Sequence, residues 1–308
     1  MSDGKDNKPL KNLYNMNLLT FDIEEWYTEF KGLQRPQEYA LFDEKLDQIL
    51  ETLERNGIKG TFFCVGQLAV QFPEVVKKIL QNGHEIGCHS NVHNWLNKMS
   101  YEECLSDTKN AVDAIEQCVG KKVLSYRAPA FSIGKKNQWA FDVLAECGIE
   151  RDSSVFPAAR DFGGFPDFGQ QQPCVIHHNG VTIKEFPIPM TMVLGKKVAY
   201  SGGGYFRFFP LSFVRNTINK VDYSMAYFHI RDLLVESNHV LSKEKYEEYF
   251  KEEGTLKARY MRYFKSSVGK RQAMSKLLKL IDQIGFINLT EADEMIDWDN
   301  APVVKLAD

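Results

Sequence analysis

Short apolar runs alternate with amphipathic segments through most of the chain, and each kind of segment has its own spacing. The apolar runs predict buried strands at 18–23, 60–65, 84–88, 123–126, 149–155 and 225–230. Apolar residues at helical spacing predict helices at 42–56, 73–80, 100–118 and 137–147. Strands that alternate with helices pair in parallel through right-handed crossovers. The pattern therefore predicts an α/β fold, and 308 residues suit a single (β/α) barrel.

The rest of the chain is less regular. A segment rich in Gly, Gln and Pro predicts a long loop at 161–180, and three successive glycines predict a tight turn or a close backbone approach at 202–204. Basic, partly amphipathic segments predict helices at 246–251 and 260–284, before a last strand at 286–289. We divide the chain into an N-terminal lead-in (1–13), a single barrel domain with a C-terminal helical extension (14–300), and a tail (301–308).

The composition is that of an ordinary globular protein. Hydrophobic residues make up 44% and charged residues 26% of the chain, and the net charge of −3 gives no reason to expect a nucleic-acid partner. None of the six cysteines forms a Cys-x-x-Cys pair, which favours free, reduced thiols. The polar start resembles no signal peptide, and no stretch approaches the roughly 20 apolar residues of a membrane span. We therefore expect a cytoplasmic protein.

Candidate ligands for a metal ion follow two of the predicted strands. An acidic cluster contains Asp22, Glu24 and Glu25, while His89 and His93 follow the third strand. If the chain turns helical there, the four-residue spacing places both imidazoles on one face, where they can bind one divalent cation. Side chains two apart in a strand point to the same side, so Asp22 and Glu24 would lie together. We predict His89, His93 and Glu24 as metal ligands, Glu25 as the alternative acidic ligand, and Asp22 as general base.

Three further residues lie at or just past strand ends. Arg127 can hold Asp22 ionised through a bidentate pair, although an ordinary surface arginine fits the same pattern. His229, as imidazolium, can protonate a leaving amine, although a lone histidine after a strand is more often part of the core. Asp152 either orients His229 by a hydrogen bond or caps a turn. In parallel barrels these strand ends are where catalytic residues gather.

Five short motifs in this order resemble those of the polysaccharide deacetylases of the NodB-homology type, which form carbohydrate esterase family four. They are Thr20–Trp26, His89–His93, Arg127–Phe131, Asp152–Phe156 and Phe228–His229. The first motif departs from the family pattern because Ile23 replaces a second aspartate, which moves the acidic ligand to Glu24 or Glu25. The fifth lacks the usual leucine spacing.

The resemblance implies a distorted (β/α) barrel that removes N-acetyl groups from an amino sugar in a polysaccharide or its precursor. It implies a divalent metal, with zinc as the leading candidate because histidine dominates the ligands, and cobalt, nickel or manganese as alternatives. It also implies Asp22, His229, Arg127 and Asp152 as the catalytic residues. Two other functions stay open: an amidase acting on a small amide, and a carbohydrate-binding protein that has lost catalysis, as the altered first motif would suggest.

Overall fold

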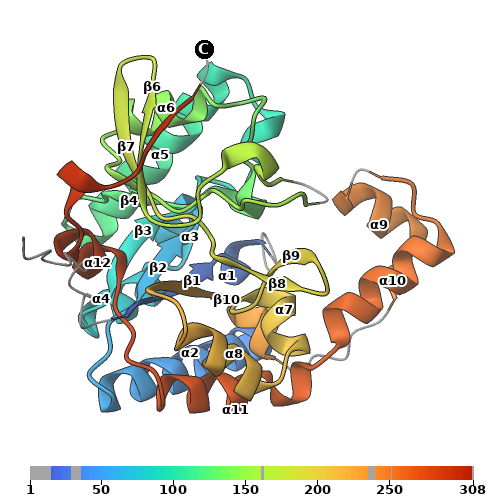
Figure 1. Cartoon of the computed structure of the whole chain (residues 1–308). Helices are drawn as coiled ribbons and strands as arrows, with labels where there is room; N and C mark the ends of the chain where they lie inside the picture. The colour runs from blue at the N-terminus through green and yellow to red at the C-terminus, as the bar shows by residue number, and fades with distance from the viewer. Residues whose placement is uncertain (1–14, 29–35, 161–162, 235–239, 251, 307–308) are drawn as a thin grey trace, which may run out of the picture.

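The computed structural model describes residues 15–28, 36–160, 163–234, 240–250 and 252–306 (Figure 1). Its main sheet has the strand order β10-β1-β2-β3-β4-β5-β7-β6-β11. The strands are β1 (Met16–Ile23), β2 (Thr61–Cys64), β3 (Glu85–Cys88), β4 (Ser125–Tyr126), β5 (Arg151–Asp152), β6 (Cys174–His178), β7 (Val181–Glu185), β10 (Tyr223–His229) and β11 (Val303–Lys305). All neighbours from β10 to β7 are parallel, and β6 runs antiparallel to β7.

Helices pack around this sheet, and a separate two-stranded hairpin stands beside it (Figure 1). The hairpin comprises β8 (Met190–Val193) and β9 (Lys196–Ala199). The helices are α1 (Glu25–Thr28), α2 (Pro36–Arg55), α3 (Gly66–Gln71), α4 (Pro73–Gln81), α5 (Tyr101–Val119), α6 (Ala140–Glu146), α7 (Gly203–Phe208), α8 (Leu211–Ile218), α9 (Lys243–Phe250), α10 (Leu256–Ser267), α11 (Lys270–Ile281) and α12 (Leu289–Met295). Short 3₁₀ turns lie at 96–98, 129–131, 166–168, 230–233 and 298–300. Among the described residues, none of the helices combines the length and apolar character that a membrane span needs.

The alternation of side chains along each strand divides the interior into two cores. The outer core joins the helices to one face of the sheet and contains Leu19, Phe21, Phe62 and Phe228. The inner core contains Leu18, Phe63, Phe186, Met225 and Tyr227. Residues on adjacent strands that face inwards meet each other, as expected when a parallel sheet curls into a barrel.

Contacts across the inner core draw the two ends of the parallel run together. The hydroxyl of Tyr223 on β10 donates a hydrogen bond to the carbonyl of Pro187, just after β7, at 2.7 Å. Gly87 leaves room for the Phe63 ring in the inner core, because a Cβ atom at position 87 would lie only 2.6 Å from that ring. The predicted α/β fold with a distorted (β/α) barrel is therefore confirmed.

The N-terminal half follows the predicted elements closely, and the C-terminal half departs from them. The expected loop at 161–180 contains β6, whose partner β7 follows a tight turn at Asn179–Gly180. The expected helix at 260–284 is divided into α10 and α11, because Gly269 has a left-handed φ of 74°. Residues 286–289 form only one bridge, Leu18–Ile287, before α12 begins.

The ends of the chain also differ from the expected division. Residues 303–305 of the expected tail form β11 and pair with β6, so they belong to the sheet. The expected lead-in at 1–13 lies outside the described residues. All six cysteines are free thiols, as predicted.

Candidate metal and catalytic site

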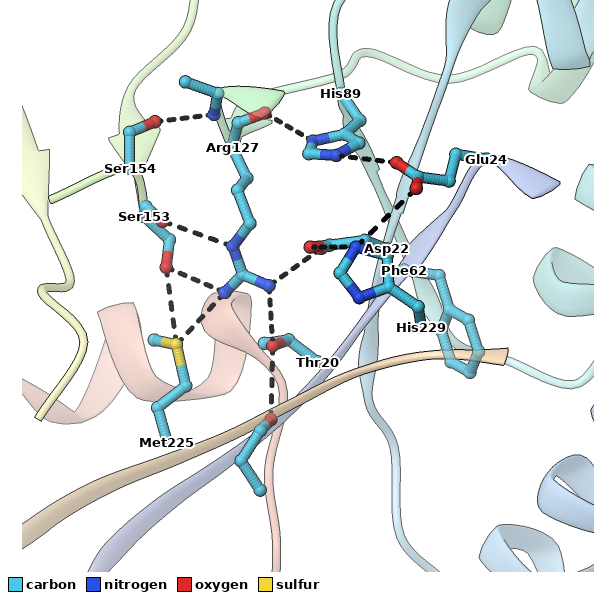
Figure 2. Close-up of polar contacts among 12 residues, drawn as sticks. Thr20, Asp22, Glu24, Phe62, His89, Arg127, Ser153, Ser154, Met225 and His229 are labelled. Atoms are coloured by element: carbon cyan, nitrogen blue, oxygen red, sulfur yellow. Dashed lines mark hydrogen bonds and ion pairs between the residues drawn. The ribbon is translucent and has the colours of Figure 1, made fainter. Parts of the chain in front are cut away.

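Asp22 occupies the inner face of β1, next to His229 in the β1–β10 register. Its Oδ1 accepts a hydrogen bond of 2.9 Å from Nη1 of Arg127 (Figure 2). Burial alone would raise the pKa of this carboxyl, but the positive charge of Arg127, with contributions from His89 and His229, lowers the pKa below its usual value. Asp22 is thus held as a carboxylate inside the barrel, which a general base requires.

Arg127 is fully buried, and the protein satisfies its guanidinium group on every side. Nη1 also donates to Oγ1 of Thr20, Nε donates to the carbonyl of Ser153, and Nη2 donates to Oγ of Ser153 and contacts the Met225 sulfur. The predicted Arg127–Asp22 pair is therefore present. It is a single hydrogen bond instead of a bidentate pair, because Thr20 and Ser153 compete for the other donors.

Glu24, His89 and His93 form the cluster predicted to bind a metal. Their candidate ligand atoms lie within 4.8 Å of one another. Oε2 of Glu24 lies 2.5 Å from Nε2 of His93 and 3.5 Å from Nε2 of His89. Two imidazole nitrogens and one carboxylate are the protein donor set of many catalytic zinc sites.

A backbone contact fixes which nitrogen of His89 faces this cluster. Nδ1 of His89 lies 2.7 Å from the carbonyl oxygen of Arg127 (Figure 2). A carbonyl oxygen only accepts hydrogen bonds, so Nδ1 carries a proton and Nε2 is the nitrogen that faces Glu24. Metal-binding histidines are commonly oriented in this way, and the donor set therefore fits a divalent cation.

The two histidines meet through a loop and not through the helical turn that the sequence suggested. Ser90 and His93 have left-handed φ values of 65° and 60°, and the segment between β3 and the 3₁₀ turn at 96–98 is not helical. Asp107 on α5 accepts a hydrogen bond of 2.9 Å from the backbone amide of Asn91. The loop's polar backbone is thus satisfied by a side chain, which removes the need for helical hydrogen bonds.

Glu25, the alternative acidic ligand, points away from the two histidines. It is buried, and its Oε1 accepts a hydrogen bond of 2.8 Å from the backbone amide of Arg231. Burial and the neighbouring charge of Glu24 raise the pKa of Glu25 to about 7. The geometry therefore favours Glu24 over Glu25 as the ligand.

His229 lies between the carboxylates of Asp22, on β1, and Glu24, just after it. Its Nε2 lies 3.7 Å from Oδ2 of Asp22 and 3.7 Å from Oε1 of Glu24 (Figure 2). Its Nδ1 lies 3.3 Å from Oδ2 of Asp232. Burial opposes the charged ring, but the carboxylates of Glu24, Asp232 and Asp22 outweigh this effect and raise the pKa of His229 well above its usual value. The ring is therefore held as an imidazolium that can donate a proton.

Of the two roles that the sequence left open for Asp152, the structure shows the cap of a turn at Ser154 and not a hydrogen bond to His229. Its carboxylate accepts hydrogen bonds from the hydroxyl and the amide of Ser154, at 2.5 and 3.2 Å, and it also shares a side-chain hydrogen bond with the buried carboxyl of Glu185. Asp232 makes the contact to His229 instead, because it lies one 3₁₀ turn further along the chain. A carboxylate three residues after a strand-end histidine is a capping-box pattern, and this signal could have identified Asp232 from the sequence.

A groove with a volume of about 820 Å³ begins beside His93. Asn94, Trp95 and Lys98 line one side, and Asn110 on α5 lines the other. These side chains combine amides, a charge and an aromatic ring, which suits a hydroxyl-rich ligand better than an apolar one.

Comparison with known sequences assigns two family models to the chain. Residues 15–151 match the model described as "Polysaccharide deacetylase", and residues 153–294 match a "Domain of unknown function (DUF3473)". The predicted metal ligands and Asp22 fall in the first match, and His229 falls in the second.

Several curated deacetylases are similar to part of the chain. A peptidoglycan-N-acetylglucosamine deacetylase of Bacillus cereus is 28% identical over 127 residues, covering 40% of this chain and 46% of the relative. The peptidoglycan-N-acetylglucosamine deacetylase PgdA of Listeria monocytogenes is 33% identical over 88 residues, covering 29% and 19%. The chain therefore spans less than half the length of these two relatives.

Among solved structures, a Mycobacterium smegmatis protein described as a polysaccharide deacetylase superposes with a TM-score of 0.61. The two chains are 16% identical, and the superposition covers 95% of this chain and 93% of the other. At this identity the likeness concerns the fold. Residues 15–151 thus match the polysaccharide deacetylase family model, and the fold of the chain is that of the Mycobacterium smegmatis protein.

Proposed function

We propose that this protein is a metal-dependent hydrolase that removes N-acetyl groups from an amino sugar in a polysaccharide or its precursor. The observation that carries the proposal is the position of His229. It lies 3.7 Å from both Asp22 and Glu24, so a proton acceptor, a proton donor and a candidate metal ligand meet at one point.

Glu24, His89 and His93 would hold the cation, and zinc is the first candidate because two of the three ligands are imidazoles. When bound, such a cation supplies Lewis acidity, which lowers the pKa of water and polarises a carbonyl group. The protein supplies the remaining steps through its own side chains.

Hydrolysis of an N-acetyl group needs one proton removed from water and one proton given to the departing nitrogen. Asp22 accepts the first proton, since Arg127 keeps it ionised and fixes its direction. His229 donates the second proton, since its carboxylate neighbours keep the ring charged. The carbon–nitrogen bond breaks, and acetate and a free amine leave.

An amino-sugar substrate is supported by two observations. The curated relatives are named for the deacetylation of peptidoglycan sugars. The groove beside His93 combines the apolar surfaces of Trp95 and Met99 with amide side chains and a charge, which suits a sugar ring with its hydroxyl groups better than a small amide. The retained base, acid and ligand set favour catalysis over a binding protein that has lost activity.

The test compares His93→Ala with His177→Ala. His177 lies on β6 and contacts Thr182, far from the cluster in the sheet order. We expect the purified His93→Ala protein to lose zinc, by elemental analysis, and to release no acetate from N-acetylated glucosamine oligomers. The His177→Ala protein should match the original chain in both measurements. Full acetate release by His93→Ala would refute the proposal.

A further inference from the structure

The hairpin formed by β8 and β9 presents an apolar tip to solvent. The side chain of Leu194 is 99% exposed, and that of Met192 is 61% exposed. Lys196 and Lys197 follow after Gly195 and are also exposed. Apolar side chains exposed together at the end of a hairpin do not stabilise the fold, and grouped exposure of this kind is a feature of interaction surfaces.

The helix α10 presents a second surface of the same kind. No residue of this helix is buried, and its outward residues follow the spacing i, i+4, i+5 and i+8. Its exposed large apolar residues are Leu256, Tyr260, Met261 and Phe264. The exposed side chains of Lys257 and Lys265 share this face, and the helix has four basic residues and no acidic one. Glu252 and Glu253 precede the N-cap residue Thr255, outside the helix.

The helix α7 joins the two surfaces. It begins four residues after β9, and its Phe208 side chain is 69% exposed. Arg207 of α7 donates a hydrogen bond of 2.8 Å to the carbonyl of Ser266 at the end of α10. Figure 1 shows the hairpin, α7 and α10 in the right half of the view, with α10 extending away from the barrel.

We propose that the β8–β9 tip, α7 and the outward face of α10 together form a docking surface for anionic lipid membranes. Apolar side chains on a basic helix are the features that place a helix in the headgroup region of a bilayer. The lysines beside them match the negative charge of anionic headgroups.

Two other partners fit this surface less well. A second copy of the chain, related by a twofold axis, would bring the same lysines into opposition with each other. A glycan would require hydrogen-bonding groups, which Leu194 and Met192 lack.

The helix α7 connects this surface with the candidate site. Its first glycine, Gly203, lies against Asp232 and the ring of Tyr227, and Asp232 contacts His229. Docking would therefore hold the α7 side of the candidate site close to the lipid headgroups. The inference does not depend on the reaction that the site catalyses.

The test is co-sedimentation of the full chain with phosphatidylcholine vesicles, with and without phosphatidylglycerol. We expect binding only to the vesicles that contain phosphatidylglycerol, and weaker binding at high salt. Leu194→Glu and Phe264→Glu should each lower the partition coefficient about tenfold or more. Val70→Glu, at an exposed apolar position on α3, should leave it unchanged.

Other results would overturn the proposal. Failure of the chain to sediment with either vesicle, or equal binding to both, would exclude an anionic lipid partner. Self-association by light scattering that Phe264→Glu abolishes, without vesicle binding, would assign the face to a second copy. Acetate release from a soluble N-acetylated oligomer should be the same in Leu194→Glu and the original chain, which separates this proposal from the proposed function.

Discussion

The carbonyl oxygen of Arg127 lies 2.7 Å from Nδ1 of His89, while the guanidinium of the same arginine lies 2.9 Å from Asp22. One residue therefore sets the proton position on a candidate metal ligand with its main chain and the charge of the candidate base with its side chain. Because the two contacts use different parts of Arg127, substitutions of its side chain can separate them.

Arg127→Ala removes the only guanidinium that contacts Asp22 among the described residues. We expect the free energy of unfolding to fall by about 3–5 kcal/mol, since a buried carboxylate is left without its counter-charge. Arg55→Ala is the control, because its pair with Asp282 is exposed and should contribute at most about 1 kcal/mol. Denaturant titration measures both. Equal losses in the two variants would contradict a structural role for the buried pair.

Asp22→Asn keeps the size and most contacts of the side chain but removes its ability to accept a proton. We expect the variant to keep its bound zinc, while the rate of acetate release falls about 10²- to 10⁴-fold. Elemental analysis and steady-state kinetics on one preparation check the two parts. A variant with a near-normal rate would move the base role to another residue.

The two adjacent glutamates make a matched pair for testing the metal site. Glu24→Gln should weaken zinc binding more than about a hundredfold, because it removes a ligand and not only a neighbour of one. Glu25→Gln should bind zinc as the original chain does, since Glu25 faces the amide of Arg231. Calorimetric zinc titration decides between them, and the reverse order of affinities would make Glu25 the ligand.

The buried carboxyls of Glu185 and Asp152 should make stability depend on pH. Burial, with the charge of Asp152, raises the pKa of Glu185 well above its ordinary value of 4.5. The folded state therefore binds more protons than the unfolded state above pH 4.5, so the free energy of unfolding falls as pH rises through the folded pKa.

Glu185→Gln cannot ionise, so its melting temperature should fall less between pH 5 and pH 8 than that of the original chain. Glu150→Gln, at an exposed position whose backbone carbonyl accepts a hydrogen bond from the amide of Lys184, should behave as the original chain does. Parallel melting curves of Glu185→Gln and the original chain across this range would show that the pair does not titrate there.

The site could be predicted largely because parallel strands bring their carboxyl ends to one edge. Asp22 and His229 are 207 positions apart in the sequence, yet they are partners in the β1–β10 register. Each follows or ends an apolar run that predicts a strand, as His89 and Arg127 do, and this shared position predicts that the four residues lie together. Strand periodicity also placed Glu24 correctly on the side of Asp22.

The parts that could not be predicted depend on contacts between distant segments. The left-handed conformation of His93 is stabilised by a loop that Asp107 holds, and no local pattern indicates that contact. The choice of Asp232 over Asp152 as the partner of His229 depends on where the chain turns after β10. The strand β6 lies in a segment whose Gly and Pro content favours loops, and its pairing with β7 overrides that local preference.

The central position of β1 in the sheet determines how a truncated form of this protein would behave. The boundary between the two matched family models falls after residue 151, yet β1 is hydrogen-bonded on one side to β2 and on the other to β10, from the second match. A fragment ending at 151 would expose the whole β10-facing edge of its central strand, together with the apolar surface that Met225 and Phe228 cover. The acidic end of that strand would then face open solvent. The two matched segments can therefore be distinguished in the sequence, but each depends on the other to fold.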